Sequence, residues 1–441
     1  MQENNKKISI IIPVRNNSSQ LKQCLQGVIA STYPDYECIV VDDGSTDDTL
    51  AVTQQFPVKI IKISKPHGPA YARNRGSEVA SGEILFFIDS DVEIYPDSLS
   101  IINENFTRHP EIDAVIGSYD DDPQESSFIS QYKNLFHHYV HQNSNENAST
   151  FWSGCGAIRR EVFLDFEGFN TGYKRPSIED IELGFRLIAA NHNIVLLKQL
   201  QVKHLKHWTF WTLLKTEIFN RGVPWTILML RFKIFPKDLN LKMSQRISGI
   251  LTAGLLITVI LLVIRFDIPS SALLLTLFLG LIGHLFYLVH PQKKALINWA
   301  LIIYVIFTGL FLASVADQIS LLFRAALLTI FLLGLALLMM QTKWFLNNFF
   351  IKYRRFILFI CIGYPLVLTF FIATYYQKLS FLPALMLFTL ILINHNFYKF
   401  FIEKRGLVFT LMVIPLHVLY YLYCEISFIL GTFSYILGRK S

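Results

Sequence analysis

Cysteine is scarce in this sequence of 441 residues, and it shows no pairing pattern. The cysteines are odd in number, widely spaced and without a C-x-x-C pair, at Cys24, Cys38, Cys155, Cys361 and Cys424. This pattern excludes a disulfide scaffold and a zinc framework and favours buried thiols. A signal-peptide core is also missing, because the apolar stretch at residues 8–14 is short and has no small-residue cleavage site after it. We therefore expect the N-terminal part to lie in the cytoplasm.

Acidic residues are almost missing from the C-terminal part. From residue 247 onward there are 14 Lys and Arg but only 4 Asp and Glu, whereas residues 1–246 have 26 and 29. The net charges of +10 and −3 add up to the formal +7. Because the positive excess lies between apolar runs, the pI near 9.0 does not indicate nucleic-acid binding. The split excludes a single soluble globule and a disordered chain, and it predicts a soluble domain fused to a membrane domain.

Apolar runs recur in the C-terminal part, each close to the ~20 residues that cross a bilayer. They cover residues 247–264, 271–289, 295–316, 319–340, 356–374, 381–398 and 407–429. Basic residues gather in alternate loops, as the positive-inside rule requires when the N-terminal domain is cytoplasmic. The pattern predicts about six to seven transmembrane helices in the cytoplasmic (inner) membrane.

An aromatic and basic segment, residues 208–235, separates the two parts. Trp together with basic residues favours helices that lie in the membrane interface, and the alternative is a core helix of the soluble domain. We therefore predict three regions. These are a cytoplasmic domain at 1–207, interfacial helices and a linker at 208–246, and a transmembrane domain at 247–441.

Strands alternate with helices in the N-terminal part. Continuous apolar runs at residues 8–14, 37–41 and 84–88 predict buried strands, and residues 19–31 and 181–191 have helical periodicity. Such alternation predicts an α/β fold with a mostly parallel sheet. Ligands of these sheets bind at the carboxyl ends of the strands.

A first acidic cluster, Asp89 and Asp91, follows the strand predicted at 84–88. Two carboxylates at this spacing can share Mg²⁺ or Mn²⁺, which completes its shell with waters and substrate phosphates. The alternative is a polar turn that caps the strand. The acidic triplet at 120–122 has the same spacing, but its strand is weaker, and we interpret it as a solvated loop.

A second acidic cluster, residues 42–48, follows the strand predicted at 37–41. Ser45 and Asp48 have the spacing of a capping box for the next helix. Capping does not explain Asp42 and Asp43, which lie at the strand tip, where a base or ribose can donate hydrogen bonds to them.

Two further motifs leave a structural and a functional interpretation open. Arg73 lies near the start of a helix, where it can contact a phosphate or simply face solvent. Ser177 and Asp180 have capping-box spacing, but Asp180 or Glu179 can equally act as a general base that deprotonates a hydroxyl. Residues 151–160 (FWSGCGAIRR) are small and aromatic, which favours close backbone approach around a ligand.

The order of these motifs strongly resembles the glycosyltransferase family 2 pattern, which has a GT-A fold. The segments in register over residues 8–190 are PVRN, VVDDGSTDDT, GPAYARNRG, ILFFIDSDVE, SGCGAIRREVF, EGFN and IEDIELGFRL. The resemblance implies a nucleotide-sugar donor of the UDP or GDP type, a divalent metal and inversion at the anomeric carbon.

The resemblance also implies roles for individual residues. The nucleotide-sugar site would comprise Pro13, Val14, Arg15, Asp42, Asp43, Arg73, Asp89 and Ser90. The sugar and acceptor pocket would comprise Trp152, Gly154, Cys155 and Gly156. Asp180 would be the catalytic base with Glu179 beside it, and the metal would lie at Asp89, Asp91 and His204, with His207 as a competitor for His204.

Departures from the family pattern narrow the function. Processive synthases carry a Q-x-x-R-W segment before their membrane helices, and residues 220–225 read NRGVPW instead. The intact pair at 179–180 favours a hydroxyl acceptor. We predict a membrane-anchored inverting glycosyltransferase that acts on a lipid or lipid-linked saccharide. The alternatives are a polyprenyl-phosphate glycosyltransferase, a polysaccharide synthase-translocator and a membrane protein that only senses nucleotide-sugar.

Overall fold

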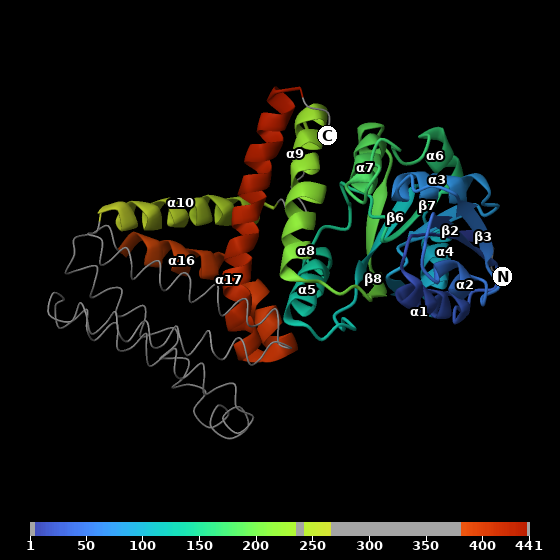
Figure 1. Ribbon diagram of the computed structural model, residues 1–441, viewed down its shortest axis with the longest axis horizontal. Coiled ribbons are helices and arrows are strands. Elements are labelled where there is room, and N and C mark those ends of the chain that lie inside the picture. The colour runs from blue at the N-terminus through green and yellow to red at the C-terminus, as the bar shows by residue number, and fades with distance from the viewer. Residues whose placement is uncertain (1–4, 235–241, 266–380, 439–441) are drawn as a thin grey trace, which may run out of the picture. The chain divides into compact units, whose positions relative to one another are not determined.

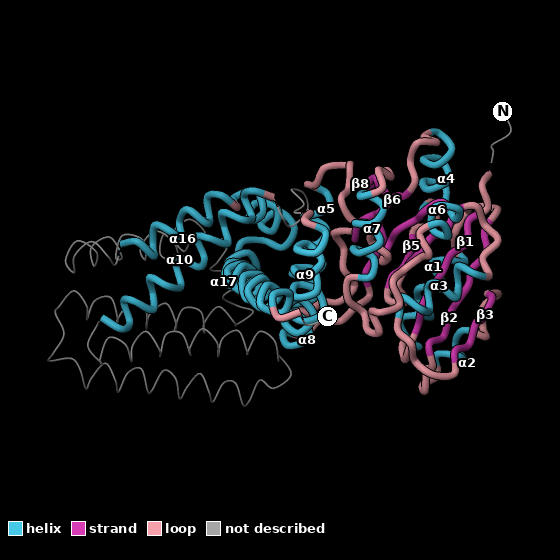
Figure 2. The backbone as a smooth tube through the Cα atoms, turned by 90° about the horizontal axis from the view of Figure 1, so that it is seen from above, coloured by secondary structure: helices cyan, strands magenta, loops and turns pink. Residues whose placement is uncertain are grey.

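The N-terminal part of the chain folds around one mixed β-sheet (Figures 1 and 2). In the computed structural model, which describes residues 5–234, 242–265 and 381–438, eight strands pair in the order β3-β2-β1-β4-β7-β6-β8-β5. The strands are β1 (Ile8–Val14), β2 (Tyr36–Asp43), β3 (Lys59–Ile63), β4 (Ile84–Ile88), β5 (Val92–Ile94), β6 (Ala114–Tyr119), β7 (Cys155–Arg159) and β8 (Ile194–His204).

The predicted α/β class is confirmed, and the strand directions show where the sheet is mixed. Strands β3, β2, β1 and β4 run parallel, and β7 then pairs antiparallel with both β4 and β6. The strands predicted at 8–14 and 84–88 have the observed bounds of β1 and β4. The carboxyl ends of β2, β1 and β4 therefore lie side by side at one edge of the sheet.

Helices cover both faces of the sheet and bury a separate core on each. They are α1 (Ser18–Ile29), α2 (Thr49–Thr53), α3 (Pro69–Glu78), α4 (Ser98–Arg108), α5 (Phe128–Gln142), α6 (Arg160–Asp165) and α7 (Glu179–Ala189). Apolar residues of α1 and α4 line one core, and those of α3, α6 and α7 line the other. Within β1, Ile10 belongs to the first core and Ile11 to the second. Burial on both faces explains why this strand is a continuous apolar run and not an alternating one.

A second group of helices packs beside α5. These are α8 (Phe210–Lys215), the π-helix η1 (Thr216–Gly222), α9 (Val223–Phe232) and the C-terminal α17 (His395–Ile436). Figure 1 shows α17 alongside α9. A Cβ added to Gly222 would meet Ser427, and one added to Gly431 would meet Thr226, so these glycines allow close approach of the two helices.

The described part of the chain divides into two compact units. The first comprises Met1–Arg246 together with Asn396–Ser441, and the second is Ile247–His395. The second unit contains most of α10 (Met243–Arg265) and α16 (Phe381–Ile393). Asn394, which directly follows α16, donates a hydrogen bond of 2.9 Å from its Nδ2 to Ser248 Oγ of α10. The predicted division at residues 207 and 246 stays a prediction.

One helix among the described residues, α17, is long and apolar enough to cross a membrane. The first predicted span, 247–264, lies within α10. The spans predicted at 271–289, 295–316, 319–340 and 356–374 lie outside the described residues. The predicted count of six to seven transmembrane helices therefore rests on the sequence pattern alone.

The bounds of the predicted span 381–398 need correction. The predicted span 381–398 is interrupted, because α16 ends at Ile393 and α17 begins at His395. The first part of α17 buries Phe397 and Phe401 against α5, and the helix then kinks at Gly406, where φ is 82°. Aromatic packing within the first unit thus occupies residues that hydropathy alone assigns to the membrane.

Candidate active site

Asp42, the penultimate residue of β2, has one carboxylate oxygen still unsatisfied. Its Oδ1 accepts a hydrogen bond from the Ser45 backbone N–H (2.9 Å), whereas the buried Oδ2 has no hydrogen-bond partner among the described residues. An unpaired buried carboxylate oxygen costs free energy unless a ligand donates to it. The adjacent end of β1 has Pro13 and Val14 buried and Arg15 exposed. Asp42 Oδ2 is therefore a buried acceptor that a ligand can satisfy.

The capping box predicted between Ser45 and Asp48 is wrong. Asp48 makes no side-chain cap to α2, and the Ser45 hydroxyl instead accepts from the Asn16 backbone N–H (3.0 Å). Asp47 accepts from Thr49 through its backbone N–H (3.1 Å) and hydroxyl (2.5 Å). The loop after β2 is thus tied to the loop after β1, which places both beside the same edge.

Asp43 has a structural position and not an open one. It is buried, and its two oxygens accept the backbone N–H groups of His67 and Gly68 at 2.8 Å each. Gly68 has φ of 99°, and an added Cβ would lie 2.6 Å from the Lys174 carbonyl oxygen. Asp43 therefore fixes the start of α3 and leaves Asp42 as the free acid of the pair.

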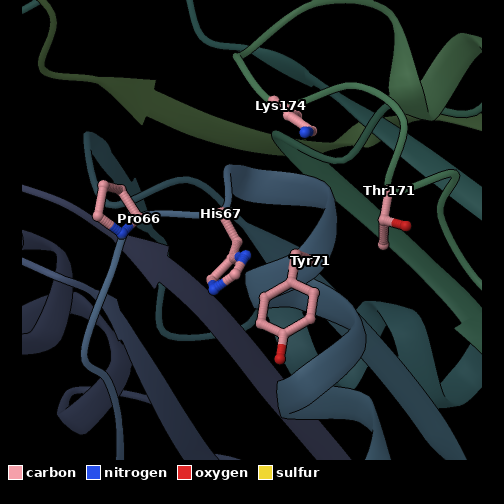
Figure 3. A pocket seen from close by; sticks show the side chains of 5 residues that line it. All are labelled: Pro66, His67, Tyr71, Thr171 and Lys174. Carbon is pink, nitrogen blue, oxygen red and sulfur yellow. The ribbon is translucent and has the colours of Figure 1, made fainter.

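A small cavity of about 300 Å³ lies at the start of α3 (Figure 3). It is lined by Pro66, His67, Tyr71, Thr171 and Lys174. The rings of His67 and Tyr71 are 4.5 Å apart, and Figure 3 shows both on the α3 side, with Thr171 and Lys174 on other segments. The predicted site residues Asp89, Asp91 and Asp180 do not line it.

Arg73 joins the two acidic motifs that the sequence places far apart. Its buried guanidinium contacts Asp89 Oδ1 at 2.6 Å and Glu179 Oε1 at 2.9 Å. It also lies 5.5 Å from the centre of the Phe169 ring. Two carboxylates already engage the side chain that was predicted to contact the diphosphate. Arg73 therefore holds the acid after β4 next to the acids that open α7.

Asp91 lies between basic groups at the same edge. His204 Nε2 is 3.8 Å and Lys206 Nζ 3.9 Å from Asp91 Oδ2. Burial alone would raise the pKa of Asp91, but His204 and Lys206 outweigh it and hold the pKa well below its ordinary value. Ser90, between the two acids, accepts from Asn17 Nδ2 at 3.0 Å. Asp91 is thus an anion at this edge of the sheet.

His204, and not His207, belongs to this site. Its ring stacks on Tyr119 with centroids 4.1 Å apart, and Nδ1 lies 2.5 Å from Asn134 Oδ1. Burial lowers the pKa of His204, while the neighbouring Asp91 carboxylate opposes this shift. His207 is exposed and pairs with Glu125 at 3.0 Å.

The donor set suits a hard divalent cation only in part. Among the described residues, no three His, Cys, Asp or Glu side chains are grouped as a ready metal cage. Mg²⁺ and Mn²⁺ sites often use one or two carboxylates and take the remaining ligands from water and phosphate. Asp89 and Asp91, with His204 beside them, fit this kind of site.

Asp180 is held in place by hydrogen bonds from Ser153. Its Oδ2 accepts from the Ser153 N–H (3.0 Å) and hydroxyl (3.1 Å), and its Oδ1 accepts from the Ile181 N–H (2.8 Å). The capping box predicted between Ser177 and Asp180 is wrong, because the Ser177 hydroxyl donates to the Asn220 carbonyl at 2.6 Å. Asp180 is half-buried, whereas Glu179 is buried against Arg73. Of the two acids, Asp180 is the one that solvent can reach.

The pocket residues predicted at 152–156 separate into two groups. Trp152 is half-buried and packs on Tyr119 (4.9 Å) and His137 (4.8 Å). Gly154 is required there, because an added Cβ would lie 2.8 Å from the indole. Cys155 and Gly156 belong to β7 and are buried in the sheet. Trp152 is therefore the accessible residue of this segment.

The acidic triplet at 120–122, which we had predicted to be a solvated loop, has one buried member, whereas Asp122 is exposed. Asp120 is buried, accepts from the Tyr95 hydroxyl at 2.6 Å and lies 3.4 Å from Lys203 Nζ. Asp121 pairs with Lys404 of α17, and Asp122 pairs with Lys203. The triplet is an ion-pair network.

Several site residues carried no recognised sequence signal. Tyr119, Asn134 and Ser153 orient His204 or Asp180 through contacts described above. Arg221, in the π-helix, is a further charged group near the same carboxylates. Ser153 opens the segment SGCGAIRREVF, although no role was predicted for it, whereas Tyr119 and Asn134 belong to no motif with a distinctive spacing and are revealed only by the folded chain.

The comparison with protein families agrees with this geometry. The family model described as glycosyl transferase family 2 matches residues 9–166. The chain contains a glycosyltransferase family 2 domain. The matched segment includes nearly all of β1 through β7 and both acids that follow β4, and it confirms the resemblance over these residues. The segments EGFN and IEDIELGFRL lie outside it.

Relatives of the glycosyltransferase domain match it over short segments. An uncharacterized glycosyltransferase, YibD of Escherichia coli, is 34% identical over 100 residues, which are 22% of this chain and 29% of that protein. A poly(ribitol-phosphate) beta-glucosyltransferase of Bacillus spizizenii is 36% identical over 119 residues, which are 25% of this chain and 19% of that protein. The chain thus spans less than a third of either relative.

One solved structure aligns with about half of the chain. The S. aureus TarS 1–349 structure in complex with UDP aligns with a TM-score of 0.41 and 19% identity. The alignment covers 56% of this chain and 70% of that one.

Replacing Asp42 with Ala should lower the affinity for a nucleoside diphosphate by roughly 10-fold or more, because a hydrogen bond to a charged group contributes about 1.5–3 kcal/mol. Titration of the purified full chain with UDP and with GDP measures this affinity. The exposed Asp48, six residues away in the same loop, supplies the matched Ala control. Equal affinities in both variants would show that Asp42 does not contact the nucleotide.

Proposed function

We propose that this protein is a membrane-associated, metal-dependent inverting glycosyltransferase. It moves a sugar from a UDP- or GDP-sugar to a hydroxyl of a lipid or lipid-linked saccharide at the cytoplasmic face of the membrane. The observation that carries the proposal is the pair of ion contacts from Arg73 to Asp89 and Glu179. Through these contacts, the carboxylates Asp89 and Asp91, which suit a donor, share one site with Asp180, which suits base catalysis and follows Glu179.

The donor side would lie along the ends of β2 and β4. Asp42 Oδ2 would accept a hydrogen bond from the base or ribose, and Lys206 would add positive charge near the diphosphate. Asp89 and Asp91 would hold Mg²⁺ or Mn²⁺, with His204 beside them. When bound, the cation would neutralise charge on the leaving diphosphate.

The acceptor side would be formed by Asp180 and its supports. Ser153 holds the Asp180 carboxylate through two hydrogen bonds, so one lone pair can face an acceptor hydroxyl. Asp180 would take the hydroxyl proton as the acceptor oxygen attacks the anomeric carbon. The bond from that carbon to the diphosphate oxygen breaks in the same step, and the nucleoside diphosphate leaves with its electron pair. A single displacement of this kind inverts the anomeric centre.

Membrane association is supported by apolar surface on the first unit. Trp211 of α8 is 65% exposed and Phe219 of η1 is 60% exposed, and Phe433 and Ile436 are similarly exposed at the end of α17. Apolar side chains exposed to this extent can mark an interaction surface when they are contiguous. Basic residues such as Lys215 are interspersed, as in helices that bind lipid surfaces. A lipid-linked acceptor would then meet the site at the bilayer surface.

The function is tested by sugar transfer with the purified full chain. A panel of UDP- and GDP-sugars is incubated with Mn²⁺ and a membrane lipid extract, and transfer to lipid is measured. We expect turnover with one donor class, and we expect EDTA to abolish it. Asp91→Asn should reduce transfer by roughly 100-fold or more, because metal stabilisation of the leaving group supplies several kcal/mol.

The exposed Asp122 provides the matched control, since Asp122→Asn removes one acidic charge from the same face of the molecule. Full activity of Asp91→Asn would contradict the metal assignment. Tight nucleotide-sugar binding with no transfer to any acceptor would instead favour a sensor.

A further inference from the structure

The π-helix η1 lies beside the proposed site and has two anchors to it. The Asn220 carbonyl accepts from the Ser177 hydroxyl at 2.6 Å, two residues before Glu179. Glu217 pairs with Lys133 of α5 at 2.9 Å, next to the Asn134 that holds His204. π-Helices are rare and are frequent at functional sites. This one is held against both the base side and the metal side.

Its charges are unequal, and the surplus is positive. The side chains of Lys133 and Glu217 are only 10% and 11% exposed, and their ion pair is short. Arg221 reaches the same Glu217 at 3.4 Å, but its side chain is 40% exposed. One carboxylate cannot neutralise two cations, and the buried lysine has the closer contact. Arg221 is therefore a partly accessible cation with incomplete compensation.

The positive charge of Arg221 is stabilised by Glu217 and by the acids of the site. Although burial opposes its charge, Glu217 and then the phenol of Tyr119 and the carboxylates of Asp180 and Asp89 raise the pKa of Arg221. Among the described residues, Glu217 is the one carboxylate that lies within 4 Å of the Arg221 guanidinium. The guanidinium is thus near the base and the metal carboxylates without being paired to either.

We propose that Arg221 binds a phosphate group of a substrate in this site. The inference rests on the proposed glycosyltransferase function. A guanidinium presents parallel N–H donors that match phosphate oxygens, and such charge-assisted hydrogen bonds are strong. Two sources carry this chemistry, namely the diphosphate of the donor and a phosphate of a lipid-linked acceptor. Glu217 acts as the positioning residue, because it contacts Arg221 while Lys133 compensates the negative charge of Glu217.

The test replaces Arg221 with Gln in the full chain and measures two quantities. One is the affinity for the nucleoside diphosphate that wild type binds, UDP or GDP, and the other is KM for the lipid acceptor. We expect at least a 10-fold loss in one of them, because hydrogen bonds to charged groups are lost. Arg221→Lys should restore part of the loss, since it keeps the charge but not the planar fork.

The pattern of losses identifies the source of the phosphate. Weaker nucleotide binding assigns Arg221 to the donor, whereas a raised acceptor KM with unchanged nucleotide affinity assigns it to the acceptor. Arg108→Gln, which removes an exposed guanidinium from α4 outside the proposed site, is the matched control. If Arg221→Gln leaves both quantities within 2-fold of wild type, the inference is overturned. Wild-type transfer in the same assay tests the proposed function separately.

Discussion

Replacing Asp180 with Asn is expected to reduce glycosyl transfer by about 10²–10⁴-fold, the range typical of a lost general base. The amide keeps the shape of the side chain and its hydrogen bonds from Ser153 can largely persist, but it cannot take a proton. Because Asp180 is proposed to face the acceptor and not the nucleotide, its replacement should leave the affinity for the nucleoside diphosphate within about 2-fold of wild type. Initial rates at saturating donor and acceptor, together with nucleotide titration, measure both quantities.

The exposed Asp165 of α6 is the control, since Asp165→Asn removes a carboxylate outside the site. Ser153→Ala should show a smaller loss of kcat, because it removes one of the hydrogen bonds that orient Asp180. A wild-type rate in Asp180→Asn would show that no base is needed. That result would favour a polyprenyl-phosphate acceptor, whose phosphate attacks without losing a proton.

Replacing Arg73 with Ala is expected to destabilise the glycosyltransferase domain by about 3–5 kcal/mol, the usual cost of removing one partner from a buried ion pair. The change leaves Glu179 buried without its cation and also removes the contact to Asp89. For a domain of this size the loss corresponds to roughly a 10 °C lower apparent Tm. Thermal unfolding of the purified full chain, followed by tryptophan fluorescence, measures the shift.

Arg75→Ala is the matched control, because Arg75 lies on the same helix and pairs with Glu78 at the exposed surface. Exposed pairs contribute about 0–1 kcal/mol, so its Tm should barely change. Arg73→Lys should be intermediate, since a lysine cannot contact both acids at once. An Arg73→Ala protein that keeps the wild-type Tm but loses nucleotide binding would place Arg73 on the diphosphate and not in a bracing role.

Strands with continuous apolar sequences could be predicted, and strands without them could not. Residues 84–88 (ILFFI) predict β4 because burial on both faces needs apolar side chains at every position. Strand β7 (Cys155–Arg159) was missed, since its small residues resemble a ligand loop. Its place in the sheet depends on antiparallel pairing with β4 and β6. That pairing is a long-range property.

The local interpretation failed where a side chain has a distant partner. Ser45 and Ser177 both have capping-box spacing, but their hydroxyls contact Asn16 and Asn220. A capping box competes with any other hydrogen bond that the fold offers the same hydroxyl. The acidic triplet at 120–122 was misjudged for the same reason, because Tyr95 and Lys203 approach it only in the folded chain.

The sequence by itself determined the α/β class, the acids at the strand ends and the family resemblance, because these depend on neighbouring residues and motif order. Only the tertiary structure decided which acid is open to a ligand and which is held. Arg73 and Glu179 are 106 residues apart in sequence, and their contact makes Glu179 a buried partner while Asp180 stays accessible. Likewise, the packing of α17 on α5 and the position of Arg221 depend on contacts between distant segments, and local propensity does not encode such contacts.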